Sequence, residues 1–317
     1  MQFVQGIDAL TRADDPSVVT VGFFDGVHLG HRSVLDTAVA RARERGLRSV
    51  GVTFDRHPRE VLTPGQEPRL LTTVDRKASL IGTSGLDLLV VIGFTPAFSK
   101  ITAHDFVRDV LVRSIGARHA VMGANFTFGY KAEGTVQTLP SMGELLGLTA
   151  EGVPLLELGG RVVSSSSVRE ALTDGELAWP VQALGRRFVL DGEVVSGHGR
   201  GKALGYPTAN LLTWPRLLLP GQGIYAGIAE VGGHRYRAAV DVGTNPTFGV
   251  DPLHVEAFLL DYEAGEIRGE PLALELWERL RDEVRYDSID ELIAAIAGDV
   301  DRTREIVPVA ALAPPDR

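Results

Sequence analysis

Two histidines stand three residues apart in the segment GFFDGVHLGH (22–31), directly before an amphipathic run. At this spacing His28 and His31 would share one face of a helical turn. Gly26 and Gly30 carry no side chains, so a phosphate group can approach the backbone, and a helix N-terminus favours an anion. The pattern predicts a site that binds a phosphate and stabilises the charge that develops on it during transfer.

The alternative interpretation is a pair of capping or surface histidines beside a glycine turn. A strand, a glycine turn, an acid, two histidines and a helix follow each other here, and that order favours the phosphate site. A zinc site is disfavoured, because no third ligand is evident and histidine pairs on helices prefer i, i+4 spacing. The G-x-G-x-x-G fingerprint of dinucleotide-binding proteins is absent at this point.

A second constellation lies in GHGRGKALGYPTANL (197–211), which is rich in glycine. It is not a P-loop, because the glycine spacing differs and no serine or threonine follows Lys202. Its glycines would still let the backbone wrap a polyphosphate, and Pro207 would fix the turn. Thr208 and Asn210 offer two hard oxygen ligands suited to Mg²⁺. The alternative is a long hairpin with a proline turn.

The first half of the chain, which contains the histidine segment 22–31, alternates β-rich runs with amphipathic runs. This alternation predicts a parallel sheet joined by right-handed crossovers, with ligands bound where strands end and helices begin. The expected strands are 18–23, 48–54, 86–94 and 117–123, and the expected helices are 31–45, 75–83 and 103–115. The expected apolar face of 31–45 comprises Val34, Leu35, Ala38, Val39 and Ala42.

The pattern changes near residue 185, where short β-rich runs separated by Gly and Pro turns begin. These runs predict an antiparallel barrel or sandwich. The expected strands are 188–195, 223–231, 235–242, 254–261 and 272–277. A final helix would follow, with Ser288 as its N-cap and a buried stripe of Ile289, Leu292, Ile293 and Ile296. We therefore expect two domains, 1–184 and 185–317.

Composition limits the classes of protein that fit. The 317 residues exceed what one ordinary core holds, and 44% hydrophobic with 23% charged residues is a soluble, globular balance. A net charge of −9 argues against broad binding to nucleic acid or an anionic membrane. The longest apolar run, 86–94, is half a membrane span. The N-terminus shows no signal-peptide pattern and the chain has no cysteine, so we expect a cytoplasmic protein.

The segment GFFDGVHLGH resembles the signature of the nucleotidyltransferase superfamily, whose members transfer a nucleotidyl group and release pyrophosphate. From residue 18 to residue 306 the chain resembles the bacterial bifunctional riboflavin kinase/FMN adenylyltransferase (FAD synthetase) family. The resemblance implies an α/β, Rossmann-like nucleotidyltransferase domain in 1–184. It also implies a riboflavin-kinase-like antiparallel β-barrel with a terminal helix in 185–317.

The resemblance also implies contacts in the first domain. Three segments resemble family segments that contact nucleotide and flavin: TFDRHP (53–58), GANFTFGYKAEGTVQTL (123–139) and RVVSSSSVREAL (161–172). His28 and His31 would hold and polarise the α- and β-phosphates of ATP. A serine cluster that opens a helix is, taken alone, more often only a cap. The other expected ATP contacts are Gly22, Phe23, Asp25, Gly30, Arg161, Ser164, Ser165 and Arg169, and the expected flavin contacts are Phe54, Asn125 and Phe128.

In the second domain GYPTAN (205–210) resembles the G-x-P-T-A-N signature of riboflavin kinases, and HVEAFLLD (254–261) resembles the strand that carries their catalytic glutamate. Glu256 would take the proton of the riboflavin 5′-hydroxyl as that oxygen attacks the γ-phosphate of ATP. Taken alone, a glutamate on such a strand usually faces solvent. Arg281 would approach the flavin. The expected ATP contacts are Gly199, Gly201, Lys202, Pro207, Thr208 and Asn210, of which Thr208 and Asn210 are the expected Mg²⁺ ligands.

The implied function is phosphorylation of riboflavin to FMN by ATP, followed by adenylylation of FMN to FAD with release of pyrophosphate. The expected partners are the substrates riboflavin, FMN and ATP, with Mg²⁺ as cofactor. The products are FMN and FAD, and we expect no nucleic acid or membrane partner. We expect a monomer or a weak homo-oligomer. Three alternatives stay open: a single activity with one idle module, a non-catalytic flavin carrier, and a nucleotidyltransferase with another acceptor, such as a pantetheine or nicotinamide compound.

Overall fold

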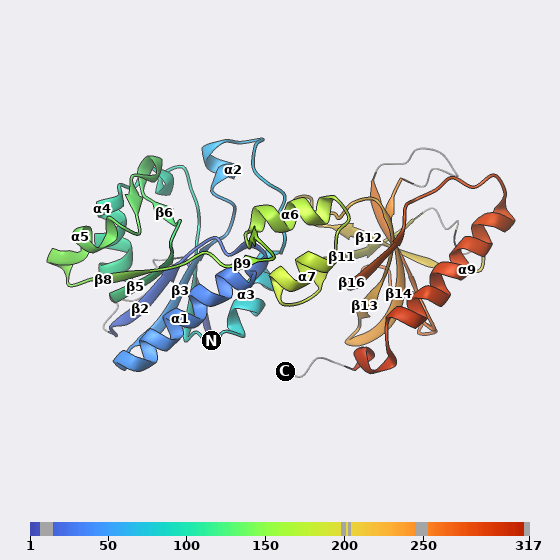
Figure 1. Cartoon of the computed structure of the whole chain (residues 1–317), viewed down its shortest axis with the longest axis horizontal. Helices are drawn as coiled ribbons and strands as arrows, with labels where there is room; N and C mark the ends of the chain where they lie inside the picture. The colour runs from blue at the N-terminus through green and yellow to red at the C-terminus, as the bar shows by residue number, and fades with distance from the viewer. Residues whose placement is uncertain (7–14, 198–200, 202–203, 245–252, 314–317) are drawn as a thin grey trace. The chain divides into compact units, whose positions relative to one another are not determined.

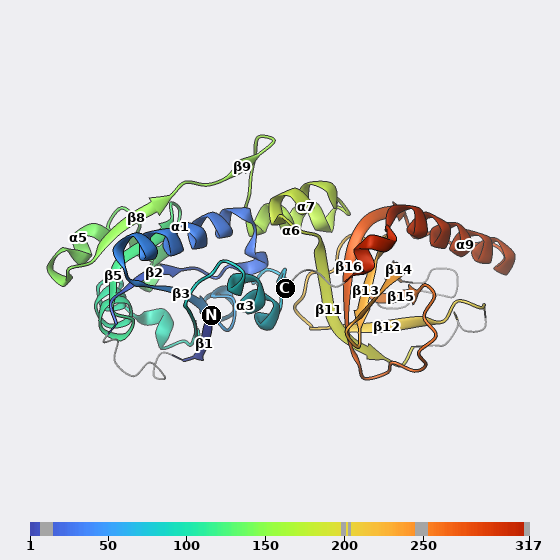
Figure 2. The same cartoon turned by 90° about the horizontal axis from the view of Figure 1, so that it is seen from below.

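The computed structural model describes residues 1–6, 15–197, 201, 204–244 and 253–313. The chain packs as two compact units, the first formed by 1–70 and 74–165 and the second by 71–73 and 166–317. The first unit is an α/β fold and the second contains a β-barrel (Figures 1 and 2). Across the described ranges, no helix combines the length and the apolar character needed to cross a lipid bilayer.

The first unit is built on a six-stranded parallel sheet in the order β1-β4-β3-β2-β5-β8. Its strands are β1 (Gln2–Gln5), β2 (Ser17–Val21), β3 (Arg48–Phe54), β4 (Leu88–Ile92), β5 (Ala117–Gly123) and β8 (Thr149–Val153). The predicted parallel α/β fold is confirmed, although the two edge strands β1 and β8 were not expected. Strand order reverses at β2, which has β3 on one side and β5 on the other. In such sheets ligands bind at the carboxyl ends of the strands at this switch point.

Helices cover both faces of the sheet (Figure 1). All five expected apolar residues of α1 (Leu29–Arg45) are buried, and this helix packs on one face, where Val34 meets Val18 of β2. Helix α3 (Val74–Gly82) lies beside α1. The opposite face is covered by α4 (Ala103–Asp105) and the π-helical η3 (Phe106–Ser114).

Shorter elements connect these layers. They are η1 (Asp25–Val27), α2 (Arg59–Leu62), η2 (Phe98–Lys100), β6 (Thr127–Phe128), η4 (Tyr130–Ala132), β7 (Gly134–Thr135), α5 (Leu139–Gly143), η5 (Glu144–Leu146), β9 (Glu157–Leu158) and β10 (Arg161–Val162).

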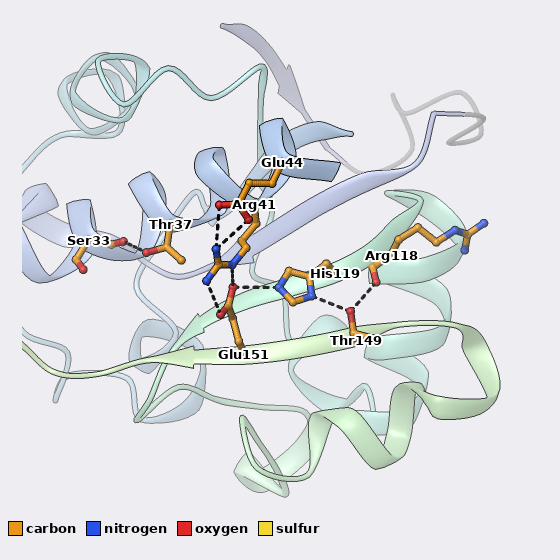
Figure 3. A network of polar contacts seen from close by, with 8 residues as sticks. All are labelled: Ser33, Thr37, Arg41, Glu44, Arg118, His119, Thr149 and Glu151. Carbon is orange, nitrogen blue, oxygen red and sulfur yellow. Dashed lines mark hydrogen bonds and ion pairs between the residues drawn. The ribbon is translucent and has the colours of Figure 1, made fainter. Parts of the chain in front are cut away.

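A polar network ties α1 to the sheet edge (Figure 3). Arg41 of α1 donates to Glu151 of β8 at 2.6 Å and to Glu44 at 2.9 Å. His119 of β5 lies 3.1 Å from Glu151 through Nε2 and 2.7 Å from Thr149 through Nδ1. Burial lowers the pKa of His119, against the hydrogen bond with Glu151. The network fixes the helix whose N-terminus carries the histidine pair.

The second unit contains a closed antiparallel barrel with strand order β11-β12-β15-β14-β13-β16 (Figure 2). Its strands are β11 (Phe188–Val195), β12 (Thr208–Thr213), β13 (Gly223–Val231), β14 (His234–Gly243), β15 (His254–Leu259) and β16 (Pro271–Arg281). Five of these strands were expected, and the barrel rather than the sandwich is confirmed. Strand β12 is not among the expected strands; it begins directly after Pro207, the residue at which the sequence predicts a turn.

Helices flank the barrel. Helices α6 (Ser165–Thr173) and α7 (Ala178–Leu184) precede it, and α9 (Ile289–Ile306) lies along β13 and β14, with η6 (Val309–Leu312) after it (Figure 2). The packing boundary falls within the first residues of α6, upstream of the expected domain border at 184/185.

The N-cap of α9 was predicted correctly, but its buried stripe was not. Ser288 Oγ accepts a hydrogen bond from the N–H of Glu291 at 3.2 Å. Ile289 is 57% exposed, and the expected Leu292, Ile293 and Ile296 are only half-buried. The buried residues of α9 are Asp299, Val300 and Thr303. The helix is therefore fully buried only along its second half and partly covered before it.

Candidate active sites

The first candidate site lies where β2 ends. Gly22 follows the strand directly, then comes the turn η1, and then α1. Phe24, Gly26 and Val27 have positive φ angles of 54°, 76° and 40°. Such a backbone costs a non-glycine residue about 1–3 kcal/mol, and it is especially rare for a β-branched side chain. A Cβ at Gly22 would lie 2.7 Å from the Phe24 ring, so this strained turn also requires glycine at its start.

The histidine pair follows the turn. His28 is the N-cap of the 17-residue α1, and its Nδ1 accepts a hydrogen bond from the backbone N–H of His31 at 3.2 Å. Because Nδ1 accepts, the proton of the neutral ring lies on Nε2, which can donate. The two rings stack with centroids 3.6 Å apart; His28 is 5% exposed and His31 is half-buried. The helix dipole and the first-turn N–H groups favour an anion beside them.

A segment from much further along the chain meets this turn. Ser165 Oγ donates to the carbonyl oxygen of Asp25 at 2.9 Å. A Cβ at Gly30 would lie 3.1 Å from Nδ1 of His28 and 3.3 Å from the carbonyl oxygen of Val163. The structure therefore brings together four residues that were expected to act jointly: Asp25, His28, Gly30 and Ser165.

The other expected ATP contacts lie on neighbouring elements. Phe23 follows Gly22 and is half-buried, while Ser164 directly precedes α6. Arg161 lies on β10. Arg169 lies on α6, within the second unit.

An aromatic cluster surrounds the ends of β3 and β4. The ring of Phe54 meets those of Phe94 at 5.3 Å and Phe98 at 5.9 Å between centroids. Phe23 packs edge-on against His57 at 4.8 Å. Phe54 is nearly buried, whereas Phe94 and Phe98 are half-buried. Such rings offer a flat ligand an apolar surface with defined stacking geometry.

The other two expected flavin contacts differ in exposure. Phe128 of β6 is buried against Phe106, with centroids 5.6 Å apart, and Phe126 stacks on it at 6.0 Å. Asn125 is exposed in the turn after β5. Sequence reasoning did not single out Phe94, Phe98, Phe126 or His57. Two of them lie inside the quoted motifs, and Phe94 and Phe98 follow β4 at the carboxyl edge of the sheet.

Lys77 of α3 is a further candidate that sequence reasoning missed. Its side chain is 3% exposed, and Nζ donates to the carbonyl oxygens of Phe23 at 3.1 Å and Phe54 at 3.0 Å. Nζ also lies 4.2 Å from the centroid of the Phe23 ring. Burial lowers the pKa of Lys77 to about 8, against the attraction of Asp25 and Asp55. The only signal in the sequence is a lysine within an otherwise amphipathic helix.

The second candidate site lies on adjacent barrel strands. Strands β12 and β15 pair so that Asn210 opposes Glu256. Thr208 Oγ1 donates to Glu256 Oε2 at 2.8 Å. Opposed residues of an antiparallel pair lie on the same face, as do residues two apart on one strand. His254 Nε2 lies 3.4 Å from Glu256 Oε1. The structure therefore joins three of the expected kinase residues in one polar group.

Strand β14 extends this row with Asp241, which opposes Glu256 from the other side. Oδ1 of Asp241 is buried, and the described part of the chain offers it no hydrogen-bond partner. Burial raises the pKa of Asp241 to about 7, and the negative charges of Glu283 and Glu256 add to the effect. Partial protonation of Asp241 near neutral pH limits the negative charge beside Glu256.

The glycine-rich segment approaches the same strands closely. A Cβ at Gly197 would lie 2.1 Å from Nδ2 of Asn210, and a Cβ at Gly201 would lie 2.3 Å from the carbonyl oxygen of Tyr206. A larger residue at Gly197 would therefore displace the Asn210 side chain, and one at Gly201 would press on the backbone of Tyr206. Pro207 is exposed directly before β12. Gly199 and Lys202 lie outside the described residues.

Arg281 ends β16, and its guanidinium group is fixed by Asp299 of α9. Nε donates to Oδ1 at 3.0 Å and Nη2 to Oδ2 at 2.7 Å, while Nη1 donates to the carbonyl oxygen of Asp282. The group also lies 5.8 Å from the ring centroid of Tyr286. These contacts hold Arg281 rigidly, and its contact with flavin stays a prediction.

Family models match both parts of the chain. The model described as FAD synthetase matches residues 10–167, and the model described as riboflavin kinase matches residues 184–307. Together with the fold, they define a two-part transferase in which a nucleotidyltransferase-like α/β unit is joined to a riboflavin-kinase-like barrel.

Similar proteins agree with the two models. The chain is 34% identical to the bifunctional riboflavin kinase/FMN adenylyltransferase of Pseudomonas fluorescens, over 96% of this chain and 98% of that one. It is 33% identical to the protein of the same name from Escherichia coli (strain K12), over 96% and 97%. A Streptococcus pneumoniae crystal structure described as a macrolide-efflux protein matches with a TM-score of 0.86 at 28% identity, over 96% and 99%. The chain belongs to the family of bifunctional riboflavin kinase/FMN adenylyltransferases.

Proposed function

We propose that the barrel transfers the γ-phosphate of ATP to the 5′-hydroxyl of riboflavin, giving FMN and ADP. The α/β unit then transfers AMP from a second ATP to FMN, giving FAD and pyrophosphate. The observation that carries the proposal is that each matched region holds the residue types its reaction needs. In the barrel, Glu256 lies beside Thr208 and Asn210. In the α/β unit, the histidine pair lies at the N-terminus of α1.

In the kinase reaction Glu256 acts as the general base. It accepts the proton of the riboflavin 5′-hydroxyl while that oxygen bonds to the γ-phosphorus and the bond to the β-phosphate oxygen breaks. The Thr208 hydroxyl orients the Glu256 carboxylate through Oε2. A Cβ at Gly201 would lie 3.3 Å from Thr208 Oγ1, so the backbone of Gly201 lies beside this residue, and there it would contact the nucleotide phosphates.

The donors beside Glu256 fit Mg²⁺. Thr208 Oγ1 and the amide oxygen of Asn210 are hard oxygen ligands on one strand face, and Gly197 has no side chain to fill the space beside Asn210. The Thr208 hydroxyl can offer a lone pair to the ion while its proton still points to Glu256. When bound, the ion would neutralise negative charge on the nucleotide phosphates.

In the adenylyl transfer a phosphate oxygen of FMN attacks the α-phosphorus of ATP, and the bond to the β-phosphate oxygen breaks to release pyrophosphate. His28 Nε2 and the His31 ring donate to phosphate oxygens whose negative charge rises in the transition state. Gly30 keeps a side chain away from the His28 ring, since a Cβ there would lie 3.1 Å from Nδ1 of His28. Ser164, Ser165, Arg161 and Arg169 would hold the remaining phosphate charge.

The isoalloxazine ring of FMN would bind at the aromatic cluster, with Phe54 at its base and Phe94 and Phe98 at its rim. Asn125 would hydrogen-bond to the ring from the turn after β5. Phe128 is buried, so its part would be to support Phe126 from behind.

We place the functional border at 184/185, between α7 and β11. The start of the riboflavin kinase match at residue 184 supports this border. Helices α6 and α7 pack with the second unit but precede the matched kinase region. We further propose that the protein acts in the cytoplasm as a monomer or weak homo-oligomer. A cysteine-free composition and small-molecule substrates support this proposal.

The direct test is a time course with riboflavin, excess ATP and Mg²⁺, in which chromatography quantifies riboflavin, FMN and FAD. The proposal predicts that FMN appears first and that FAD follows. Accumulation of FMN without FAD would refute adenylylation of FMN and point to another acceptor for the α/β unit. Flavin binding without any turnover would indicate a carrier.

A further inference from the structure

The turn that presents the histidine pair is strained, and several contacts hold it. The N–H of Val27 donates to the carbonyl oxygen of Phe24 at 3.1 Å, and Ser165 Oγ donates to that of Asp25 at 2.9 Å. Phe24 and Val27 both have left-handed backbone, with φ angles of 54° and 40°. Residues in this region keep such a conformation only where the surrounding structure enforces it. Beside these two bonds, the turn has a further anchor on its strand side, at the carbonyl oxygen of Phe23.

Lys77 supplies that anchor. Its Nζ donates to the carbonyl oxygen of Phe23, the last residue before the strained turn. The same nitrogen donates to the carbonyl oxygen of Phe54, at the end of the neighbouring β3. Thr53 Oγ1 donates to the carbonyl oxygen of Phe23 as well, at 3.0 Å. One backbone oxygen therefore accepts two side-chain donors, which uses both of its lone pairs.

We propose that Lys77 is a positioning residue for adenylyl transfer, whose ammonium group holds the turn 24–27 in the shape that presents His28 and His31. This inference rests on the proposed function of the α/β unit. Lys77 also links the histidine turn to Phe54, at the base of the aromatic cluster. The two halves of the site, for phosphate and for flavin, therefore share one buried cation.

Burying a lysine is costly unless its charge is compensated. The charge of Lys77 is stabilised by two backbone carbonyls, by the face of the Phe23 ring and by the nearby carboxylates of Asp25 and Asp55. A purely apolar residue would fill this place on α3 without such a cost. What a lysine adds at this position is its hydrogen bonds to the carbonyl oxygens of Phe23 and Phe54.

The test compares Lys77→Met, which keeps the side-chain length, with Lys100→Met, which removes an exposed lysine of the same unit. For Lys77→Met we expect kcat of FAD formation from FMN to fall about 10- to 100-fold, because small displacements of reacting groups are costly. KM values for FMN and ATP should stay within about threefold of wild type. Riboflavin phosphorylation by the same preparation, and both activities of Lys100→Met, should be unchanged.

Two further measurements separate positioning from general stability. Amide hydrogen exchange should speed up in peptides that cover 22–31 and stay unchanged in those that cover β4 and β5. In a His31→Ala background, Lys77→Met should cause little further loss of kcat if it acts through the pair. Thr53→Val, which removes only one donor to Phe23, should cause a smaller loss in the same direction, even if Lys77→Met fails to fold.

An unchanged kcat in Lys77→Met would refute the inference. Faster exchange across the whole sheet would also refute it, because Lys77 would then only stabilise the fold. Should wild-type protein form no FAD, the proposed function would be wrong, and the exchange of 22–31 would still decide whether Lys77 holds the turn.

Discussion

The register of β12 against β15 makes Glu256→Gln an informative substitution. Glutamine keeps the side-chain length, and its amide oxygen can accept the bond that Thr208 donates to Glu256 at 2.8 Å. Asn210 would still oppose the residue across the strand pair. The substitution removes the group that accepts the proton, so the rate of FMN formation should fall about 10²–10⁴-fold. This loss corresponds to an increase of about 3–5 kcal/mol in the activation free energy. Because binding contacts survive, KM for riboflavin should stay within about threefold.

The assay follows initial rates of FMN formation by chromatography at saturating ATP and Mg²⁺, with FMN-to-FAD conversion measured on the same preparation. Glu230→Gln is the matched control, because Glu230 is an exposed carboxylate on β13 of the same barrel. We expect the control to equal wild type and Glu256→Gln to lose only FMN formation. A kcat within about threefold of wild type would refute the role of Glu256 as general base. An equal loss of FAD formation in the folded protein would refute the separation of the two sites.

Three other substitutions test the remaining reasoning. His31→Ala should lower FAD formation by about 100-fold or more while sparing FMN formation, and equal losses in a folded protein would contradict the assignment. Gly197→Ala would place a Cβ 2.1 Å from Nδ2 of Asn210, so kcat of riboflavin phosphorylation should fall about tenfold or more, and a normal rate would show that the segment can move aside. Asp241 has a pKa of about 7 against an ordinary 3.8, so the folded chain holds an extra proton between these values and its stability falls as pH rises through them. Asp241→Asn should therefore raise the free energy of unfolding at pH 8 by at most about 4 kcal/mol, and leave it little changed at pH 4, in calorimetry of the full chain; an equal change at both pH values would contradict the raised pKa.

Much of the fold could be predicted because its strands and helices carry strong periodic patterns. The ends of β3, β5, β11 and β13 fall where the runs of hydrophobic and β-branched residues indicated. The apolar face of α1 and the Ser288 cap followed from the same kind of local signal. The missed strands lack it. QFVQ (2–5) and TAEGV (149–153) are short edge strands with polar or glycine residues. Strand β12 begins directly after Pro207, inside a glycine-rich motif whose residues indicate a binding segment rather than a strand.

Contacts between distant segments were harder to predict than elements. The motif residues of each candidate site were identified, yet the bond from Ser165 to Asp25 spans 140 residues and has no local pattern. Ile289 was expected to be buried but is largely exposed. A helical stripe of apolar residues predicts which face packs on the barrel, but not how far along the helix that contact extends. Lys77 was missed because its two acceptors are backbone carbonyls, which any residue type can provide.

The two sites depend on different kinds of long-range order. In the barrel, strand register decides the site, since a slip of one residue in β15 would turn Glu256 to the opposite face, away from Asn210. In the α/β unit, the site depends on the shape of a strained turn. Side chains from outside the motif donate hydrogen bonds to backbone oxygens of this segment: Lys77 and Thr53 to Phe23, and Ser165 to Asp25. The motif GFFDGVHLGH therefore specifies which groups are presented to a phosphate. Residues from three other segments determine whether the turn keeps the shape that presents them.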